Sequence, residues 1–221
     1  MTPAPVIPSR EVMARGAALH QIVDALSRGK IVAYPTETFY GLGVDATSAA
    51  AVQRLLAAKG RPWGNPIPLI IARPEDVDRI AREISEEART LAARFWPGPL
   101  TLILRASPAI PEGVTAGTGK VGVRVSSHPV AAAIAEACPF PITATSANRS
   151  GAPAAGAPEE FSAAIRGALD LLVDGGRTPG GSPSTVLDVT EHPPRILREG
   201  AIARAEIDAV LHARDRPSSL E

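Results

Sequence analysis

The sequence is short of cysteine and of aromatic residues, and both shortages limit what the protein can be. One cysteine, Cys138, occurs in 221 residues, so no disulfide can form within the chain. No histidine lies close to Cys138 in the sequence to activate its thiol, and we interpret it as a buried, unreactive side chain. Aromatic residues make up only 4% of the chain, so the core must consist mainly of Ala, Val, Leu and Ile.

The signatures of several common catalytic sites are also absent. The four histidines show no metal-ligand spacing, so we expect no metal site formed by protein side chains. No G-x-S-x-G elbow or G-x-x-x-x-G-K-[ST] loop occurs, and no G-x-G-x-x-G motif follows a predicted strand. These absences disfavour a serine hydrolase, a Walker-type phosphate loop and a Rossmann cofactor site.

No apolar run is long enough for a signal peptide or a membrane span. Residues 1–11 (MTPAPVIPSRE) have no apolar core, and no stretch approaches the roughly 20 apolar residues of a spanning helix. We therefore expect a cytoplasmic protein with no membrane contact. Basic and acidic residues number 23 each, so the net charge is zero, which disfavours a dedicated nucleic-acid binder but is compatible with a local basic cleft.

Helix and strand patterns alternate along the chain and predict an α/β protein. Helical spacing predicts helices at residues 11–28, 48–59, 74–80, 85–95, 129–137, 158–167 and 205–211. Short apolar runs predict strands at residues 31–34, 67–72, 100–105, 121–125, 142–145, 169–173, 185–189 and 195–198. The last three strands cluster without helices between them, which favours a single α/β domain with a mixed β-sheet over a purely parallel one. We expect that domain at residues 10–205, followed by a helix end and tail at residues 206–221.

Two loops offer polar side chains next to secondary structure. The loop at residues 36–43 follows a strand and carries the hydroxyls of Thr36, Thr38 and Tyr40, which can bind a ligand or merely close a turn. The loop at residues 143–151 (TATSANRSG) also follows a strand and can direct hydroxyls and N–H groups at phosphates, although an ordinary polar loop explains it equally well.

Basic residues supply the other candidates for a site. Lys59 and Arg61 flank a glycine at the end of a predicted helix, where they either face the helix dipole or grip an anion with several oxygens. Arg124 lies within an apolar strand and must meet solvent or a partner. Arg198, near the end of the last predicted strand, is either a phosphate partner or an exposed charge.

Seven segments stand out along the chain: residues 34–43 (YPTETFYGLG), 59–62 (KGRP), 96–104 (WPGPLTLIL), 121–128 (VGVRVSSH), 143–151 (TATSANRSG), 184–188 (STVLD) and 196–200 (ILREG). Together, and in this order, they resemble the YrdC-like family of threonylcarbamoyl-adenylate synthases. The resemblance covers about residues 15–205. Within the family, the chain is similar to the short, single-domain branch, which lacks the additional carboxy-terminal domain of longer relatives.

This resemblance implies a YrdC-like fold, in which a twisted mixed β-sheet is flanked by helices and forms a concave basic cleft. It also implies a nucleotidyltransferase activity. The implied enzyme makes threonylcarbamoyl-AMP and pyrophosphate from L-threonine, bicarbonate or CO₂, and ATP, with Mg²⁺ carried by the ATP and no organic cofactor. The implied product goes to a tRNA-threonylcarbamoyl transferase complex that forms N6-threonylcarbamoyladenosine at position 37 of tRNA. Alternatives are a paralogue that binds a nucleotide or carbamoyl-adenylate for another step, and a module that binds double-stranded RNA or tRNA.

The resemblance also assigns roles to individual residues. It implies that Lys59, Arg61, Ser146 and Asn148 are catalytic and bind the ATP phosphates. It implies threonine contacts from Thr36, Tyr40, Arg124 and Ser184, and further ATP contacts from Lys120 and Arg198. One departure stands out, because many relatives carry a histidine near the threonine at the position that is Ile70 here.

Overall fold

The computed structural model describes residues 3–60, 64 and 66–214. Its helices are α1 (Ser9–Met13), α2 (Ala17–Ser27), α3 (Ala49–Lys59), α4 (Val77–Ile80), α5 (Glu86–Phe95), α6 (Glu112–Thr115), α7 (Pro129–Ala137), α8 (Ala163–Ala168) and α9 (Arg204–Arg214), with 3-10 turns at Pro74–Asp76 and Pro158–Glu160. Its strands are β1 (Val6–Pro8), β2 (Val32–Tyr34), β3 (Gly41–Gly43), β4 (Leu69–Ile70), β5 (Ala81–Arg82), β6 (Leu100–Ala106), β7 (Lys120–Arg124), β8 (Ile142–Thr143), β9 (Thr145–Ser146), β10 (Leu171–Asp174), β11 (Thr185–Asp188) and β12 (Arg195–Arg198). None of the described helices is long and apolar enough to cross a membrane.

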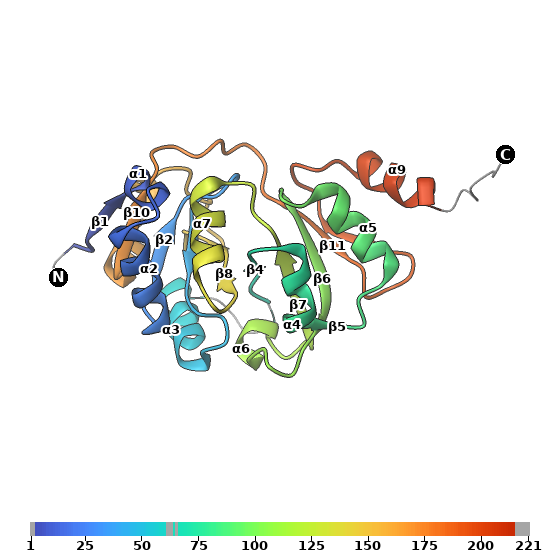
Figure 1. Cartoon of the computed structure of the whole chain (residues 1–221), viewed down its shortest axis with the longest axis horizontal. Helices are drawn as coiled ribbons and strands as arrows, with labels where there is room; N and C mark the ends of the chain where they lie inside the picture. The colour runs from blue at the N-terminus through green and yellow to red at the C-terminus, as the bar shows by residue number, and fades with distance from the viewer. Residues whose placement is uncertain (1–2, 61–63, 65, 215–221) are drawn as a thin grey trace.

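The strands are divided between two mixed sheets. One has the order β1-β10-β2-β3-β9, and the other has the order β12-β11-β6-β7-β4-β8 with β5 beside β6. Each contains parallel and antiparallel pairs, so the predicted α/β class with mixed pairing is confirmed, although two sheets take the place of one. In Figure 1, β1, β2 and β10 lie toward the N-terminal end of the molecule and β6, β7 and β11 toward the other end.

The chain crosses between the sheets within the segment predicted as one strand at residues 142–145. β8 pairs with β4 in one sheet, whereas β9 pairs with β3 in the other, and only Ala144 separates them. The Ala144 N–H donates to the carbonyl oxygen of Pro68 at 2.8 Å, which fixes the crossing point against the segment that leads into β4. The single predicted strand is therefore wrong, because a run of alternating residues does not indicate which neighbours its halves will pair with.

The helix predicted at residues 11–28 is also wrong, because it is interrupted after its first turns. Between α1 and α2, Arg15 takes a left-handed conformation with φ of 53° and Gly16 follows it. The break lets Val12 of α1 and Leu19 of α2 both become buried in the core cluster that also contains side chains of α7. Tertiary packing has overridden a continuous helical pattern here.

The core follows the predicted composition. A larger cluster of mainly aliphatic side chains includes residues of both sheets, and a smaller one lies between the first sheet and α1, α2 and α7. The predicted helix at residues 158–167 is instead a 3-10 turn followed by α8, which Ser162 caps by accepting from the Ile165 N–H at 3.3 Å. β1 was not predicted, and its half-exposed Val6 explains why the pattern is weak. The domain limits at residues 10 and 205 stay a prediction.

Candidate active site

A cavity of about 410 Å³ is lined by residues from both sheets. β3 and β9 contribute from one sheet, and β6, β7 and β12 contribute from the other. The predicted residues that line it are Thr36, Tyr40, Arg124, Ser146, Asn148, Ser184 and Arg198. Among the described residues of the lining none is Asp or Glu, whereas two are arginines, so the cavity suits anionic ligands.

Arg124, at the end of β7, is buried against an acidic partner that the sequence did not identify. Its side chain is 6% exposed, and its Nη1 lies 3.3 Å from Oε1 of Glu37. The other carboxylate oxygen of Glu37 accepts a hydrogen bond from the hydroxyl of Ser126. The Arg124 Nε is buried and makes no hydrogen bond within the described chain, so this guanidinium still has donors to offer.

Ser184 and Arg198 form a second polar group on the cavity wall. The Arg198 Nη2 donates to the carbonyl oxygen of Ser184 at 2.8 Å and to its hydroxyl at 3.0 Å. The Ser184 hydroxyl also lies 3.0 Å from that of Thr101, a buried β6 residue that lines the same cavity. Burial lowers the pKa of Arg198, and the nearby positive charge of Arg124 lowers it further, which indicates that the two guanidiniums repel each other.

Lys59 lies behind the cavity wall formed by the loop after β9. This side chain is buried, and its Nζ donates to the carbonyl oxygens of Ser146 at 2.5 Å and Asn148 at 2.6 Å. The Ser146 hydroxyl donates to Oδ1 of Asn148 at 2.5 Å. Three of the four predicted catalytic residues therefore form one hydrogen-bonded group, and the fourth, Arg61, lies outside the described residues.

The end of α3 is closed by Gly60 rather than by a side chain. Gly60 takes a left-handed conformation with φ of 56°, and its N–H donates to the carbonyl oxygen of Ala57 at 3.1 Å. This is the usual glycine cap of a helix, as the sequence predicted. It leaves the Lys59 side chain directed toward the loop after β9.

Thr36 and Tyr40 line the cavity, but neighbouring backbone already engages their hydroxyls. The Thr36 hydroxyl donates to the carbonyl oxygen of Phe39 at 2.6 Å. The Tyr40 hydroxyl donates to the carbonyl oxygen of Gly176 at 2.8 Å and accepts from the Gly175 N–H at 3.0 Å. Burial raises the pKa of Tyr40 to about 12, so this hydroxyl stays protonated and anchors the segment after β10.

The structure does not bring Lys120 to the cavity. Lys120 begins β7 and Arg124 ends it, so about 13 Å of extended strand separates them. The Lys120 ammonium donates to Asp188 at 2.8 Å and to Glu191 at 3.3 Å. A role in binding ATP stays a prediction for Lys120, without support from this geometry.

Ile70 does not line the cavity, although the pairing of β4 with β7 places it opposite Arg124. It is fully buried in the smaller core cluster, and the residue of its segment that lines the cavity is Pro68.

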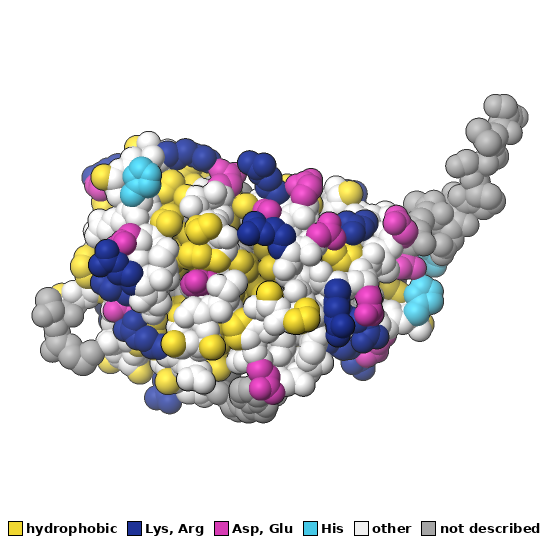
Figure 2. All heavy atoms as spheres, turned by 60° about the horizontal axis from the view of Figure 1, so that its bottom comes forward, with side chains coloured by type: hydrophobic (Ala, Val, Ile, Leu, Met, Phe, Trp, Pro, Cys, Tyr) yellow, Lys and Arg dark blue, Asp and Glu magenta, His cyan; other side chains and the backbone are white. Residues whose placement is uncertain are grey.

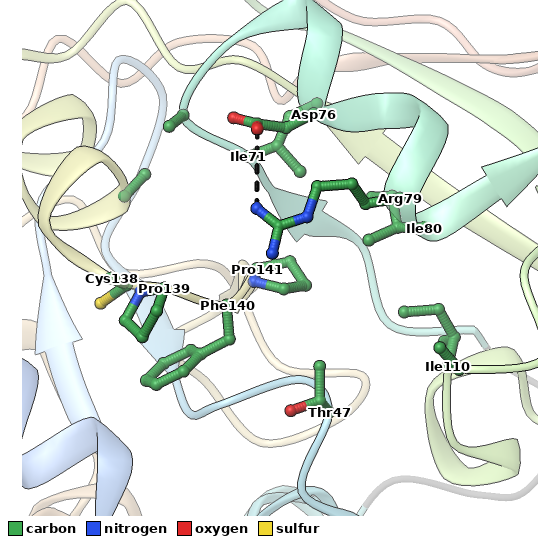
Figure 3. Close-up of a pocket in the computed structure, with 13 residues that line it drawn as sticks. Thr47, Ile71, Asp76, Arg79, Ile80, Ile110, Cys138, Pro139, Phe140 and Pro141 are labelled. Atoms are coloured by element: carbon green, nitrogen blue, oxygen red, sulfur yellow. Dashed lines mark ion pairs between the residues drawn. The ribbon is translucent and has the colours of Figure 1, made fainter.

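A second hollow, of about 360 Å³, contains none of the predicted site residues (Figure 3). Its lining is largely apolar, and its ion pair, between Arg79 and Asp76, spans 3.8 Å with a mostly exposed arginine. Cys138 also lines it and is half-buried rather than buried, and burial raises the pKa of its thiol to about 12, which disfavours the thiolate. Within the described part of the chain, no group of three or more His, Cys, Asp or Glu could hold a metal ion.

Sequence reasoning missed Glu37, Thr101 and Ser126. Glu37 lies between two threonines inside the YPTETFYGLG segment, which marks it as a residue of that loop but does not indicate that it pairs with Arg124. Thr101 lies in the apolar strand β6, where a single hydroxyl reads as an ordinary strand residue until its neighbour Ser184 is known.

Known proteins are similar to this chain in sequence and in fold. A family model named for Sua5, YciO and YrdC, with the description "Telomere recombination", matches residues 24–200. A protein of Pyrococcus abyssi (strain GE5 / Orsay) named threonylcarbamoyl-AMP synthase is 45% identical over 84% of this chain and 55% of its own length. One of the same name from Bacillus subtilis (strain 168) is 40% identical over 91% of this chain and 58% of its own.

A solved structure agrees with these relatives. The crystal structure of P. abyssi Sua5 complexed with L-threonine is 39% identical, with a TM-score of 0.85 over 95% of this chain and 61% of that chain. The chain thus spans somewhat more than half the length of these relatives. The family match over residues 24–200, together with these identities, shows that the protein belongs to the Sua5/YciO/YrdC family.

Proposed function

We propose that the protein is an L-threonylcarbamoyladenylate synthase, a nucleotidyltransferase that acts on L-threonine, bicarbonate and ATP. The observation that carries the proposal is one cavity with Arg124, Ser184 and Arg198 on one side and Ser146 and Asn148, held by Lys59, on the other. A pocket with two separate anion-binding groups suits a reaction that joins two anions.

The names of the relatives support this choice of substrate. Two of them are named threonylcarbamoyl-AMP synthase, and the P. abyssi structure carries L-threonine. At about 40% identity over almost the whole chain, the same pocket is expected to take the same amino acid.

In the proposed mechanism the amino acid binds at the Arg124 end of the cavity. The buried guanidinium, whose Nε lacks a partner in the described chain, pairs with the carboxylate of threonine. Ser184 and Thr36 lie beside the rest of the bound threonine, and Tyr40 forms part of the cavity wall. The amine of threonine captures CO₂ or bicarbonate and becomes a carbamate, and bicarbonate loses water in that step.

ATP binds toward the loop after β9. Lys59 and Asn148, together with Arg61, provide charge and donors for the triphosphate, and Arg198 contributes from the opposite wall. The described lining has no carboxylate that could hold Mg²⁺, so the ion would come with the ATP and would neutralise charge on its phosphates. A carbamate oxygen forms a bond to the α-phosphorus as the bond from that phosphorus to pyrophosphate breaks.

The reaction needs no covalent enzyme intermediate, so the lack of an activated nucleophile is no obstacle. Holding carbamate and triphosphate in line can supply roughly 7–11 kcal/mol of the barrier. Fixed cations and N–H donors stabilise the charge that develops around the α-phosphorus. The product carries an activated threonylcarbamoyl group for a tRNA-threonylcarbamoyl transferase complex, and we infer a cytoplasmic location because ATP and tRNA occur together there.

Direct RNA binding is the competing hypothesis from a different class. On the face shown in Figure 2, basic side chains lie among acidic ones and form no continuous basic tract. The zero net charge points the same way. A titration from about 50 to 200 mM salt separates the two, since RNA affinity would fall steeply and threonine affinity would barely change.

The decisive experiment is pyrophosphate release by the purified protein. Release from ATP should require both L-threonine and bicarbonate, and mass spectrometry should identify threonylcarbamoyl-AMP. Equal release with L-serine, or with no amino acid, would contradict the proposed specificity. ATP binding without threonine-dependent turnover would instead favour a paralogue that performs another step.

A further inference from the structure

Glu37 is the acidic side chain behind the cavity wall. It does not line the cavity, its side chain is 11% exposed, and its Oε1 is shielded from solvent. Its other oxygen accepts from the hydroxyl of Ser126, which itself accepts from the His128 N–H at 3.2 Å. Glu37 is thus tied to the start of α7 and is the ion-pair partner of Arg124 among the described residues.

The pair between Glu37 and Arg124 is held by charge rather than by an aligned hydrogen bond. The two atoms lie 3.3 Å apart, yet Glu37 Oε1 and Arg124 Nε both lack a hydrogen-bond partner in the described chain. A buried guanidinium fixed in this way keeps its N–H groups uncommitted. They remain available to a ligand carboxylate in the adjacent cavity.

Arg124 also needs a counter-charge because it shares the cavity with a second guanidinium. Arg198 lines the same space, and the two positive charges oppose each other. Without a carboxylate behind it, the Arg124 guanidinium would be repelled by Arg198 and would move away from the position in which it can contact a bound ligand.

We infer that Glu37 is a positioning residue that holds the Arg124 guanidinium in the orientation in which it receives the carboxylate of the amino-acid substrate. The inference rests on the proposed function, and it goes beyond it by assigning amino-acid affinity partly to a residue that never touches the ligand. Glu37 acts only through Arg124, so its loss should affect the carboxylate of the amino acid and leave the nucleotide alone.

Calorimetric titrations of L-threonine and of ATP test this inference. Glu37→Gln removes the charge but nearly preserves the shape, and it should weaken L-threonine binding at least about tenfold, with ATP affinity unchanged within about twofold. Glu37→Asp keeps the charge at a shorter reach and should show an intermediate loss. Glu136→Gln breaks an exposed ion pair with Arg15 and serves as the matched control, with no change in either affinity.

L-Threoninamide, which lacks the carboxylate, gives a readout that a general loss of structure would not produce. The wild-type preference for L-threonine over L-threoninamide should collapse in Glu37→Gln. Equal weakening of L-threonine, L-threoninamide and ATP, or tighter L-threonine binding, would overturn the inference. If Glu37→Gln does not fold, Glu37→Asp provides the test. An unchanged affinity of Glu37→Asp for L-threonine would also overturn the inference.

The two proposals can fail separately. Wild-type protein that binds L-threonine without releasing pyrophosphate would reject the proposed function while the affinities of the Glu37 variants stay readable. Wild-type protein that turns over normally, with Glu37 variants of unchanged affinity, would reject only the role of Glu37. A wild-type chain that binds no L-threonine would reject both.

Discussion

The Nζ of Lys59 lies 2.6 Å from the carbonyl oxygen of Asn148, which joins the end of α3 to the loop after β9. Because the Lys59 side chain is only 2% exposed, this ammonium is both a candidate for phosphate binding and a structural link. The sequence alone posed these roles as alternatives. The structure shows the structural link, and phosphate binding stays a prediction, so a test must measure activity and stability in the same variant.

Lys59→Met is expected to lower both the rate of pyrophosphate release and the free energy of unfolding, by different amounts. The variant keeps most of the apolar stem but leaves two partly buried carbonyl groups without their charged donor, which should cost about 1–3 kcal/mol in urea unfolding. Pyrophosphate release should fall by roughly a hundredfold or more, because a fixed cation near the phosphates is lost. Lys30→Met, at an exposed position, is the control. A loss of stability without a loss of rate would assign Lys59 a structural role alone.

Arg198 and Lys120 should respond differently to substitution, because only Arg198 lines the cavity. Arg198→Gln should reduce pyrophosphate release at least about tenfold, since it removes a cation from the wall and frees the Ser184 hydroxyl. Lys120→Met should leave the rate nearly unchanged. Steady-state kinetics with ATP varied will decide, and a large rise in the KM for ATP in Lys120→Met would restore its assignment as an ATP contact.

The Lys120–Asp188 pair predicts how stability depends on pH. Burial raises the pKa of Asp188, but hydrogen bonds from Lys120 and Thr190 outweigh it and hold the pKa below its ordinary value. The hydrogen bond to Asp188 likewise raises the pKa of Lys120. The aspartate therefore adds stability that is complete above the ordinary pKa of about 3.9 and lost as the pH falls through the lower folded value.

The lysine adds stability that is complete below its ordinary pKa of about 10.4 and lost as the pH rises through the raised value. The difference in unfolding free energy between wild type and Lys120→Met should thus be largest near neutrality and shrink toward about pH 3. Urea unfolding at several pH values measures it. A difference that is constant from neutral to acid pH would show that the pair is not responsible.

Tyr40→Phe tests the anchor on the segment after β10. The variant removes a hydroxyl that bonds to both Gly175 and Gly176, and we expect a loss of about 1–2 kcal/mol in unfolding free energy. Faster hydrogen exchange at the Gly175 amide should accompany it, because that N–H loses its acceptor. Exchange at the Ile165 amide of α8, which Ser162 caps, should stay unchanged and serves as the internal reference.

The fold class could be predicted because apolar runs and helix periods depend on local sequence. The pairing of those runs could not, since β8 and β9 are two residues each and their partners lie about 70 to 100 residues away. The break near Arg15 was hidden for a similar reason, because the helical pattern continues through it and packing against α7 decides otherwise.

Most of the candidate site was reachable from the sequence through the resemblance of its segments to a family. Arg124, Ser184 and Ser146 come from distant parts of the chain, and nothing in their spacing indicates that they share a cavity. The partner of Arg124 was beyond reach because a charge pair between β7 and the loop after β2 leaves no local pattern. Lys120, whose ATP contact stays a prediction, illustrates the opposite difficulty, since a place on β7 does not indicate which end of the strand lies at the cavity.

Ala144 gives the molecule a very short tether between its two sheets, because one residue separates β8 from β9. A small molecule that touches both walls of the neighbouring cavity therefore resists their separation in addition to filling space. Ligand binding and the association of the two sheets are then thermodynamically linked. A ligand at a hundredfold excess over its Kd should raise the free energy of unfolding by about 2.7 kcal/mol. Threonine and ATP added together should raise the melting temperature of the whole chain as one cooperative unit.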